Sequence, residues 1–417
     1  MFYTGLGIAR SLGAKGIRVI GLTADRKSYG NFTRYAKVVA CPDSRSEPQE
    51  LLVFLTRLGQ ELRSRAVIFP TRDDDLVFLD RFRAQLEPYF SMVAPGAEAL
   101  DICLNKWKTY LAAAGTGVAA PKAWLIEGAE DVRRMASEPS YPCVLKPLAA
   151  HHWRKGGNWT LVGARKAIWV DSEAALTTEY AAIRQADNRA LLQEMVPGSD
   201  EALVIVACYL DRQGRWVAGF NTQKLVQIPE GLGTGCILQS ADRAELFEPT
   251  DRLLRSIGFS GIAEVEYKWD SAAGEYKLIE INPRPWDQHR LGDACGTDLI
   301  YMAYCDHAGL PMPKDGKPIA GQKWIAEDAF LTAVVRMLWR RDPRLWVLLR
   351  RARGKRVFAI WSARDPVPFL AYLLGGLFPA LWRAGLSGLD SLLKRLGLRK
   401  RLPDQKGLVY GGSLEKP

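Results

Sequence analysis

The sequence predicts an α/β (α+β) fold, and three patterns along the chain support this prediction. Between residues 17 and 94, short β-type runs alternate with helical patterns, which is typical of a small parallel sheet. Between residues 99 and 310, strand-like runs follow one another with few helices, which favours a mainly antiparallel sheet. From about residue 322 the pattern becomes helical and basic. We therefore expect three parts, residues 1–98, 99–320 and 321–417.

In the first part, the sequence pattern indicates alternating strands and helices. Strands are expected at residues 18–22, 37–40, 66–69 and 91–94, with helices at 47–63 and 73–86. Gly5 and Gly7 indicate a strand-to-helix loop with a tight turn, either a plain structural turn or a nucleotide site. Only three residues precede Thr4, so the strand expected before this loop is missing. We expect either an upstream extension that supplies this strand or a sheet that lacks it.

The second part begins with a predicted helix and continues mainly in strands. The helix is expected at residues 100–115, and a loop is expected at 149–160 because Gly156 and Gly157 lie beside Arg154 and Lys155. Strands are expected near 143–146, 191–195, 202–210, 216–227, 261–269 and 275–281.

Composition limits the class of protein and its compartment. Of 417 residues, 48% are hydrophobic and 25% are charged, as in ordinary globular proteins with a sizeable core. The seven Cys have no CxxC spacing, so neither a disulfide framework nor a thiolate metal site is indicated. The N-terminus lacks the pattern of a secretory signal, and a reducing cytoplasmic location is expected.

Positive charge is concentrated near the C-terminus. Residues 331–402 contain 16 Lys or Arg against three Asp, a local charge of +13, whereas the whole chain carries +11. The remainder is therefore slightly acidic, and no nucleic-acid partner is expected for it.

Two carboxylate-bearing strands provide the most informative chemistry. Side chains alternate between the two faces along a strand. In the strand expected near 261–269, Glu264 and Glu266 therefore share one face, and at the end of the strand expected near 275–281, Glu280 and Asn282 share one face. A turn at residues 270–274 would bring these oxygens together. Hard oxygen ligands of this kind suit Mg²⁺. The alternative is a surface hairpin with solvated acids.

Several motifs in order resemble the ATP-grasp superfamily. They are Val-Leu-Lys-Pro at 144–147, Gln-Glu-Met-Val-Pro-Gly at 193–198 and Glu-Ile-Asn-Pro-Arg at 280–284. Phe-Pro-Thr-Arg-Asp-Asp at 69–74 and Gly-Leu-Gly-Thr-Gly-Cys at 231–236 are similar to the carboxylate–amine ligase branch that includes D-aspartate ligases. The resemblance covers residues 5–310. It implies an ATP-grasp fold in residues 99–320, preceded by a truncated Rossmann-like domain and followed by a basic helical extension.

The resemblance implies a nucleotide site. Lys106 and Lys146 match the two lysines that hold ATP phosphates, with Lys108 as the spare candidate. The backbone of Glu194, Met195 and Val196 matches the segment that meets adenine, and Glu201 is placed like the acid that binds ribose. The alternatives are lysines that extend from core strands and a solvated loop acid at 201.

The resemblance also implies metal and substrate contacts. Glu266, Glu280 and Asn282 match Mg²⁺ ligands, with two ions expected and Mn²⁺ able to substitute, and Glu264 is expected to support them. Arg284 is expected to neutralise the transferred phosphoryl group or to form a structural ion pair.

Two further segments are expected to meet the ligands. Lys224, with Gly231, Gly233 and Gly235, is expected in a carboxylate or acceptor pocket, the alternative being a Gly-rich hairpin. The loop at 149–160 is expected to close over the triphosphate with Arg154 or Lys155 near phosphate, whereas His151 and His152 are expected to pack the loop.

These features predict an ATP-dependent ligase that forms an amide or peptide bond through an acyl phosphate and releases ADP and phosphate. Its partners are expected to be a small-molecule carboxylate and an amine. One alternative is a carboxyphosphate-forming carboxylase or carbamoyl-phosphate-type synthetase, and another is a non-catalytic nucleotide-binding scaffold.

The basic C-terminal part predicts a surface contact. The uncharged stretch 366–382 is too short and too interrupted by Pro and Gly for a confident membrane span. Aromatic and Leu faces with basic flanks favour peripheral contact of residues 330–402 with an anionic membrane, at its cytoplasmic face. An interdomain or homodimer contact, a true span and nucleic-acid binding are the alternatives.

Overall fold

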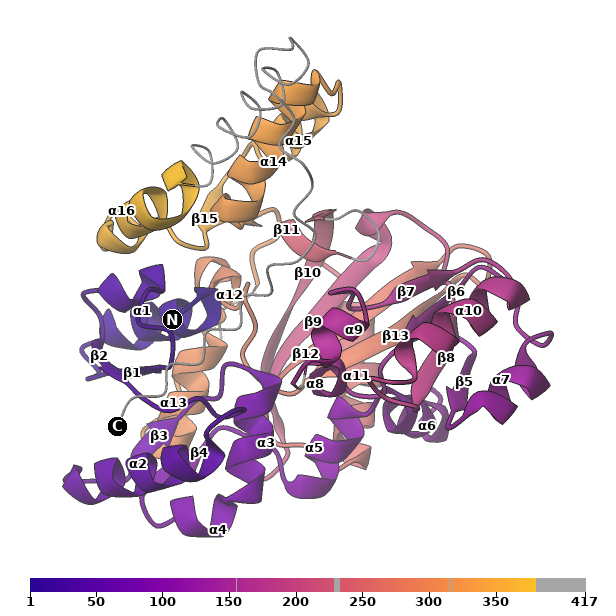
Figure 1. The fold of residues 1–417 in the computed structure, drawn as a ribbon. Coiled ribbons are helices and arrows are strands. Elements are labelled where there is room, and N and C mark those ends of the chain that lie inside the picture. The colour runs from indigo at the N-terminus through magenta and orange to yellow at the C-terminus, as the bar shows by residue number, and fades with distance from the viewer. Residues whose placement is uncertain (155, 229–232, 315, 317, 380–417) are drawn as a thin grey trace, which may run out of the picture. The chain divides into compact units, whose positions relative to one another are not determined.

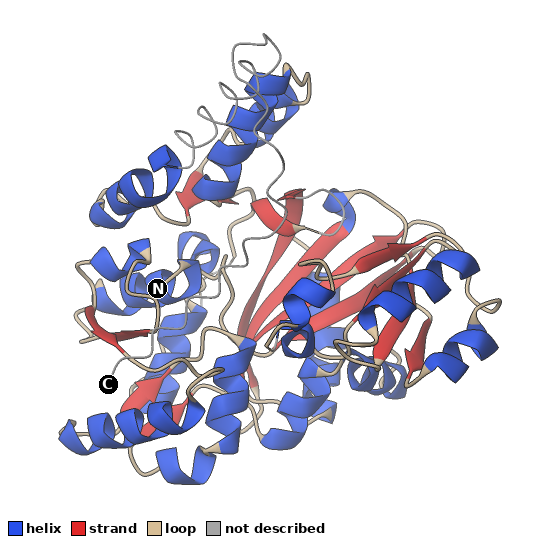
Figure 2. Ribbon diagram, viewed as in Figure 1, coloured by secondary structure: helices blue, strands red, loops and turns tan. Residues whose placement is uncertain are grey.

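A computed structural model of the chain describes all residues except 155, 229–232, 315, 317 and 380–417. Contacts divide the chain into two units, residues 1–369 and 370–417. Figures 1 and 2 show the elements, which belong to mixed helical and sheet architecture. The α/β class is therefore confirmed, whereas the boundaries expected at residues 98 and 320 stay a prediction.

The N-terminal segment alternates strands and helices as the sequence predicts. Its elements are α1 (Tyr3–Gly13), β1 (Ile20–Thr23), η1 (Tyr29–Phe32), β2 (Lys37–Ala40), α2 (Pro48–Glu61), β3 (Ala66–Ile68), α3 (Asp73–Arg81), α4 (Arg83–Leu86) and β4 (Phe90–Met92). β1 pairs in parallel with β2, and β3 pairs in parallel with β4, in two separate sheets. The expected parallel strands are thus present, but the sheet is divided into two pairs, and the additional strand expected from the sequence stays a prediction.

The loop expected at Gly5 and Gly7 is wrong, because both residues lie inside α1. A Cβ added to Gly7 would lie 2.5 Å from His289 Nε2 and 3.0 Å from Arg290 Cγ. Glycine at this position therefore permits close packing of α1 against residues 289–290, and no turn is required.

The helix expected at residues 100–115 is two helices, α5 (Ala97–Leu104) and α6 (Lys106–Gly115). Asn105 separates them with extended backbone, and its side-chain oxygen accepts hydrogen bonds from the N–H groups of Trp107 and Lys108. This is an N-cap, and it places Lys106 at the first position of a new helix.

A four-stranded antiparallel sheet follows, in the strand order β5-β8-β6-β7. Its segment comprises β5 (Ala123–Ile126), α7 (Ala129–Met135), β6 (Cys143–Lys146), α8 (Ala150–Arg154), α9 (Asn158–Leu161), β7 (Ile168–Val170), α10 (Glu173–Ile183) and β8 (Ala190–Glu194). The loop expected at residues 149–160 instead folds mostly into α8 and α9. A buried cluster that includes Trp153, Val162 and Ile168 fixes these short helices to the sheet.

The largest sheet has seven strands in the order β13-β12-β9-β10-β11-β14-β15. Its segment contains η2 (Asp200–Ala202), β9 (Leu203–Leu210), β10 (Trp216–Ile228), β11 (Thr234–Ala241), η3 (Ala244–Leu246), α11 (Phe247–Ser256), β12 (Gly261–Asp270), β13 (Glu275–Asn282), α12 (Arg290–Cys295), α13 (Leu299–Ala308) and β14 (Lys323–Ile325). Neighbouring strands are antiparallel except β14 and β15. The expected antiparallel character is confirmed.

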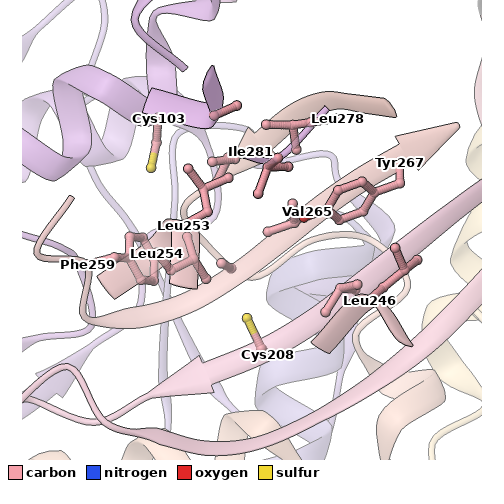
Figure 3. Packing of buried hydrophobic residues seen from close by; sticks show 14 of the residues in the cluster. Cys103, Cys208, Leu246, Leu253, Leu254, Phe259, Val265, Tyr267, Leu278 and Ile281 are labelled. Atoms are coloured by element: carbon pink, nitrogen blue, oxygen red, sulfur yellow. The ribbon is translucent and has the colours of Figure 1, made fainter. Parts of the chain in front are cut away.

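One face of this sheet is covered by an apolar cluster that joins it to α5, α6 and α11. Cys208 from β9, Val265 from β12 and Leu278 from β13 meet Leu253 and Leu254 of α11 and Cys103 of α5 (Figure 3). All of these side chains are buried. The opposite side of β12 and β13 is free to carry polar groups. A β-bulge in the register next to Glu266 interrupts the alternation, so that Leu278 faces the cluster although Glu280, two residues on, lines the other side.

The segment after residue 322 is not only helical. It contains α14 (Glu327–Arg340), α15 (Leu345–Arg351), β15 (Arg356–Phe358) and α16 (Val367–Tyr372). β14 pairs with β11, and β15 pairs in parallel with β14, so these short strands extend the seven-stranded sheet. The helical expectation is wrong at these strands, because three-residue runs carry too little periodicity to be recognised.

The described part of the second unit includes η4 (Leu373–Leu377), a π-helical turn. Within the described residues, no helix combines the length and apolar character needed to cross a bilayer.

Candidate active site

A cavity of about 450 Å³ lies where the polar sides of both large sheets and the N-terminal segment converge. Ten Lys or Arg and six Asp or Glu side chains line it. The cationic residues are Arg45, Arg72, Lys106, Lys146, Arg154, Arg165, Lys166, Lys224, Lys268 and Arg284. A lining with this excess of cations favours anionic ligands.

Two of these lysines enter from different elements. Lys106 begins α6, and its backbone N–H donates to the Leu148 carbonyl at 2.9 Å. Lys146 ends β6, and its Nζ donates to Gln193 Oε1 at 2.9 Å. Burial and the nearby charge of Lys106 lower the pKa of Lys146 to about 8. Both predicted phosphate lysines thus line one cavity, whereas Lys108 pairs with Asp101 and is not among the lining residues.

The acidic side of the cavity is built by the hairpin of β12 and β13. Its register places Glu266 opposite Glu280 and Glu264 opposite Asn282, and residues 271–274 form the connection. All four side chains line the cavity. The cross-strand arrangement expected from the sequence is therefore present.

Each of the two opposed carboxylates is held by a lysine. Lys224 Nζ donates to Glu266 Oε2 at 2.6 Å, and Lys106 Nζ lies 3.5 Å from Glu280 Oε2. Burial alone would lower the pKa of Lys224, but Glu266 and its acidic neighbours raise it above its ordinary value. Burial would raise the pKa of Glu280, but Lys106, Lys146 and Lys224 lower it. Glu280 is therefore ionised and Lys224 is charged.

Asn282 and Glu264 form the second cross-strand pair. Asn282 Nδ2 donates to Glu264 Oε2 at 3.0 Å and to Glu280 Oε1 at 3.4 Å. Burial and the charge of Glu266 raise the pKa of Glu264 to about 8. Within the described part of the chain, the amide oxygen of Asn282 accepts no hydrogen bond, so it is available to a cation.

The chemistry of this donor set fits Mg²⁺. Two carboxylates, Glu266 and Glu280, and the Asn282 amide oxygen are hard ligands, and Mg²⁺ is commonly held by one or two carboxylates together with phosphate oxygens. Among the residues that the structure describes, no group of three or more His, Cys, Asp or Glu side chains could hold a metal by itself. A divalent ion here would therefore depend on nucleotide phosphates for its remaining ligands.

Arg284 follows β13 and meets the N-terminal segment. Its Nε donates to Asp73 Oδ1 at 2.6 Å, and Asp73 is the first residue of α3. Burial would lower the pKa of Arg284, but Asp73 raises it, and Arg284 holds the pKa of Asp73 below its ordinary value against burial. The structure thus places Arg284 in the cavity lining in an ion pair with Asp73, and its role towards a phosphoryl group stays a prediction.

The predicted nucleotide hinge is only partly at the cavity. Met195 and Val196 line it, whereas the Glu194 side chain accepts a hydrogen bond from the Ser140 N–H at 3.0 Å. Glu201 is not among the lining residues and forms an ion pair with Arg351.

The helices α8 and α9 bring further groups to the cavity. His151, Arg154 and Trp159 line it, and the Arg154 carbonyl accepts a hydrogen bond from Arg45 Nη1 at 3.4 Å. His152 Nδ1 lies 3.0 Å from Asp187 Oδ2, a contact that packs this segment as expected. Lys155 lies outside the described residues.

The segment predicted as an acceptor pocket contributes Lys224, Gly233, Thr234 and Gly235 to the lining. Lys166 Nζ donates to Thr234 Oγ1 at 2.8 Å. Gly231 falls in the range 229–232, outside the described residues.

Some lining residues have no counterpart among the sequence predictions. Asp73 lies in the motif at residues 69–74 and Gln193 in the motif at 193–198, but neither residue is given a role in the sequence analysis. Membership of these motifs is the sequence feature that could have identified them as site residues. Asp287, which accepts a hydrogen bond from Thr4 Oγ1 at 2.9 Å, and Lys268 lie in no recognised motif. Lys268 follows Glu264 and Glu266 at period two on β12, so strand alternation offered a signal for it, whereas only the three-dimensional packing brings Asp287 to the cavity.

Known proteins resemble this chain in sequence. Relatives include the vancomycin/teicoplanin A-type resistance protein VanA of Enterococcus faecium, 26% identical over 197 residues, which are 44% of this chain and 53% of the relative. A D-aspartate ligase of Enterococcus faecium is 21% identical over 266 residues, 60% of this chain and 62% of the relative. The chain thus spans less than two thirds of the length of either relative.

Solved structures share the fold. Biotin carboxylase of Campylobacter jejuni in an ATP-type complex superposes with a TM-score of 0.61 at 19% identity, covering 77% of this chain and 72% of that chain. The biotin carboxylase domain of the Hydrogenobacter thermophilus 2-oxoglutarate carboxylase, with MgADP and bicarbonate, gives a TM-score of 0.61 at 15% identity, with 77% and 71% coverage.

The model of the carbamoyl-phosphate synthase L chain ATP-binding domain matches residues 105–313, which contain most of the cavity lining. The matched range includes Lys106, Lys146 and the carboxylates of β12 and β13, so the family signal and the site coincide. Since this match covers half of the sequence and the fold agrees, the chain belongs to the ATP-grasp family with a carbamoyl-phosphate synthase-type ATP-binding domain.

Proposed function

We propose that this protein is an ATP- and Mg²⁺-dependent carboxylate–amine ligase that forms an amide or peptide bond. The observation that carries the proposal is the convergence in one cavity of two phosphate lysines, the Glu266, Glu280 and Asn282 oxygens, and the Arg284–Asp73 pair. The similarity to a D-aspartate ligase supports a ligase rather than a scaffold.

The proposed reaction has two balanced steps. A carboxylate oxygen attacks the γ-phosphorus of ATP and ADP leaves, which gives an acyl phosphate. The amine nitrogen then attacks the acyl carbon, phosphate leaves, and the nitrogen loses a proton. No covalent bond to the protein is required, so positioning and charge neutralisation are the protein's tasks.

The residues divide these tasks. Lys106 and Lys146 would bind phosphate oxygens, and the backbone of Met195 and Val196 would border adenine. Arg284, fixed by Asp73, would present the remaining guanidinium N–H groups to the phosphoryl or acyl phosphate oxygens. Mg²⁺ held by Glu266, Glu280 and Asn282 would neutralise phosphate charge.

Two finer assignments belong to the same proposal. We expect two Mg²⁺ ions at full occupancy. Mn²⁺ should substitute for Mg²⁺, because carboxylate and amide oxygens are suitable ligands for both metals. Lys224 and residues 233–235 would border the carboxylate or acceptor site, because they line the cavity next to Glu266.

The experiment is a screen of ADP release with amino acids and small carboxylates, offered singly and in pairs, with Mg²⁺. The proposal predicts turnover that requires both an acid and an amine, and product mass equal to their sum minus water. Lys146→Met is the inactive control. ATP consumption that depends on bicarbonate alone would replace this proposal with a carboxylase, and nucleotide binding without turnover would leave a scaffold.

We also propose that residues 330–402 contact an anionic membrane. Trp339 and Trp346 on α14 and α15 are 68% and 73% exposed, and Arg340, Arg341 and Arg344 lie near them in the sequence. Exposed Trp beside Arg suits a bilayer interface, where each basic residue contributes about 1 kcal/mol. Residues 380–402 lie outside the described part of the chain.

Vesicle co-sedimentation tests this contact. Binding should rise with the fraction of anionic lipid, fall with salt, and weaken in the double variant Trp339→Ser, Trp346→Ser but not in Trp169→Ser, an exposed Trp of β7. A dimer that dissociates in the double variant, without any vesicle binding, would favour the homodimer alternative.

A further inference from the structure

A second cavity lies beside the C-terminal half of α1. Its volume is about 130 Å³, well above the ~10–15 Å³ that one water requires. Its lining residues come from the end of α1 and the residues after it, the segment before β2, α12 and the segment before α16. They are Arg10, Ser11, Ala14, Lys15, Tyr35, Arg290, Asp293, Ser362 and Arg364. None of the described residues lines both this cavity and the candidate active site.

Arg10 presents an unused donor to this cavity. The side chain is 3% exposed, and its Nε donates to Asp365 Oδ2 at 2.9 Å. Its Nη2 donates to the carbonyls of Ile360 and Asp365 at 2.8 and 3.0 Å. Its Nη1 is buried and has no hydrogen-bond partner among the residues that the structure describes. A buried guanidinium donor in a fixed position without a partner is costly, and a bound acceptor would remove this cost.

Arg290 adds a second unused donor. Its Nε is also buried, and no described residue forms a hydrogen bond with it. Burial lowers the pKa of Arg10, and the charge of Arg290 lowers it further although Asp365 opposes both effects. The two guanidinium groups therefore repel each other, and Arg364 lines the same cavity. Within the described part of the chain, neither Arg290 nor Arg364 has an acidic ion-pair partner.

The acidic groups nearby do not cancel this positive charge. Asp298 is bonded to Lys15 Nζ at 2.5 Å and to Ser11 Oγ at 2.8 Å, contacts that keep its pKa low despite burial. Burial and the adjacent Asp298 raise the pKa of Asp293 well above its ordinary value. Of this pair, Asp293 is therefore the member that favours its protonated form, and its Oδ1 is buried without a hydrogen-bond partner among the described residues.

We propose that this cavity binds a phosphate-type anion, with Arg10, Arg290 and Arg364 as its guanidinium donors. Planar guanidinium groups match tetrahedral oxyanions, and an anion between Arg10 and Arg290 would both satisfy their donors and remove their repulsion. The ligand is either inorganic phosphate or the terminal group of a small phosphomonoester. The site is separate from the catalytic cavity and does not depend on the proposed ligase activity.

The test uses the full-length protein with Mg²⁺ and a non-hydrolysable ATP analogue in excess, so that the catalytic cavity is filled. Calorimetric titrations with inorganic phosphate and with glycerol 3-phosphate should show a saturable site for one of them, which identifies the source. Arg290→Gln and, separately, Arg364→Gln should weaken binding at least tenfold. Arg184→Gln, at an exposed position after α10, is the matched control and should bind like wild type.

Thermal melting separates binding from folding. Arg364 is exposed, so Arg364→Gln should melt like wild type without ligand, and only the wild-type and Arg184→Gln proteins should gain stability on adding the anion. Absence of saturable binding, or equal affinity in both Arg variants and wild type, would show that the cavity holds only water. If the ATP analogue itself fails to bind, the difference between Arg290→Gln and wild type still decides the question.

Discussion

Glu280→Gln is the sharpest test of the metal and phosphate assignments. The substitution keeps the shape of the side chain and removes the charge that Lys106, Lys146 and Lys224 surround. At the 3.5 Å separation of Lys106 Nζ and Glu280 Oε2, one ion pair is worth about 5 kcal/mol at an effective dielectric of ~20. Desolvation offsets much of this, and the Glu280 side chain is 34% exposed, so we expect a loss of about 1–3 kcal/mol of folding stability.

The effect on catalysis should be larger than the effect on folding. The amide retains one oxygen but no negative charge, so the site would hold Mg²⁺ with one carboxylate fewer. A loss of about 3 kcal/mol in transition-state stabilisation corresponds to roughly a hundredfold lower kcat. The Mg²⁺ concentration for half-maximal rate should rise at least tenfold.

Coupled ADP-release assays across a Mg²⁺ titration, together with thermal melts, measure both effects. Glu275→Gln is the matched control, because Glu275 begins the same strand at an exposed position. A Glu280→Gln protein with wild-type rate and wild-type Mg²⁺ dependence would refute the reasoning.

Three further predictions follow from the same contacts. Lys224→Met should leave Glu266 buried without its partner and destabilise the fold by about 3–5 kcal/mol, measured by denaturant unfolding with Lys122→Met, at an exposed position, as control. Because the pKa of Lys146 falls from 10.5 to about 8, its charge is present below pH 8 and lost above it; ATP affinity should therefore fall as pH rises through 8, and Lys146→Arg should remove this step. Arg351→Gln should free Glu201, and a raised preference for ATP over 2′-deoxy-ATP would support Glu201 as the ribose acid, whereas an unchanged preference would exclude it.

The parts of the site that the sequence predicts are those fixed by local geometry. Period-two alternation predicts that Glu264 and Glu266 share one face and that Glu280 and Asn282 share another. The pairing of Glu266 with Glu280 also needs the β-bulge that shifts the register between Glu266 and Tyr267, and alternation along the strands does not predict this bulge. The positions of Lys146 and Asn282 follow in the same way from strands that end at recognised motifs.

The parts that the sequence does not predict depend on long-range packing. Arg284 and Asp73 are 211 residues apart, and no periodicity along the chain reports that they meet. Glu201 occupies the expected position in the chain, yet its partner is Arg351, 150 residues away. Spacing along the chain does not report tertiary contacts of this kind, and the ribose role of Glu201 stays a prediction.

Local signals also misled where packing decided the backbone. Gly7 is in the sequence pattern of a turn but lies in helix α1. Glycine is needed there because a side chain would collide with His289 and Arg290, which pack against this position. Asn105 interrupts what looks like one apolar helix, since its side chain caps the next helix. In each case the residue type was informative. The contact that explains the residue type, however, cannot be read from the neighbouring residues in the sequence.

The charge distribution of the cavity links nucleotide binding to metal binding. Lys106 and Lys224 occupy the same carboxylate oxygens that a divalent ion would need. Among the described residues, Lys146, Arg154, Lys166 and Lys268 have no acidic ion-pair partner and line the cavity with free positive charge. Entry of a triphosphate would draw Lys106 towards phosphate and release Glu280, whereas a metal ion alone would have to displace this lysine without compensation. The site should therefore bind Mg²⁺ weakly without nucleotide and tightly with it. The nucleotide removes the free-energy cost of displacing Lys106 from Glu280, and by thermodynamic linkage Mg²⁺ should strengthen nucleotide binding by the same factor.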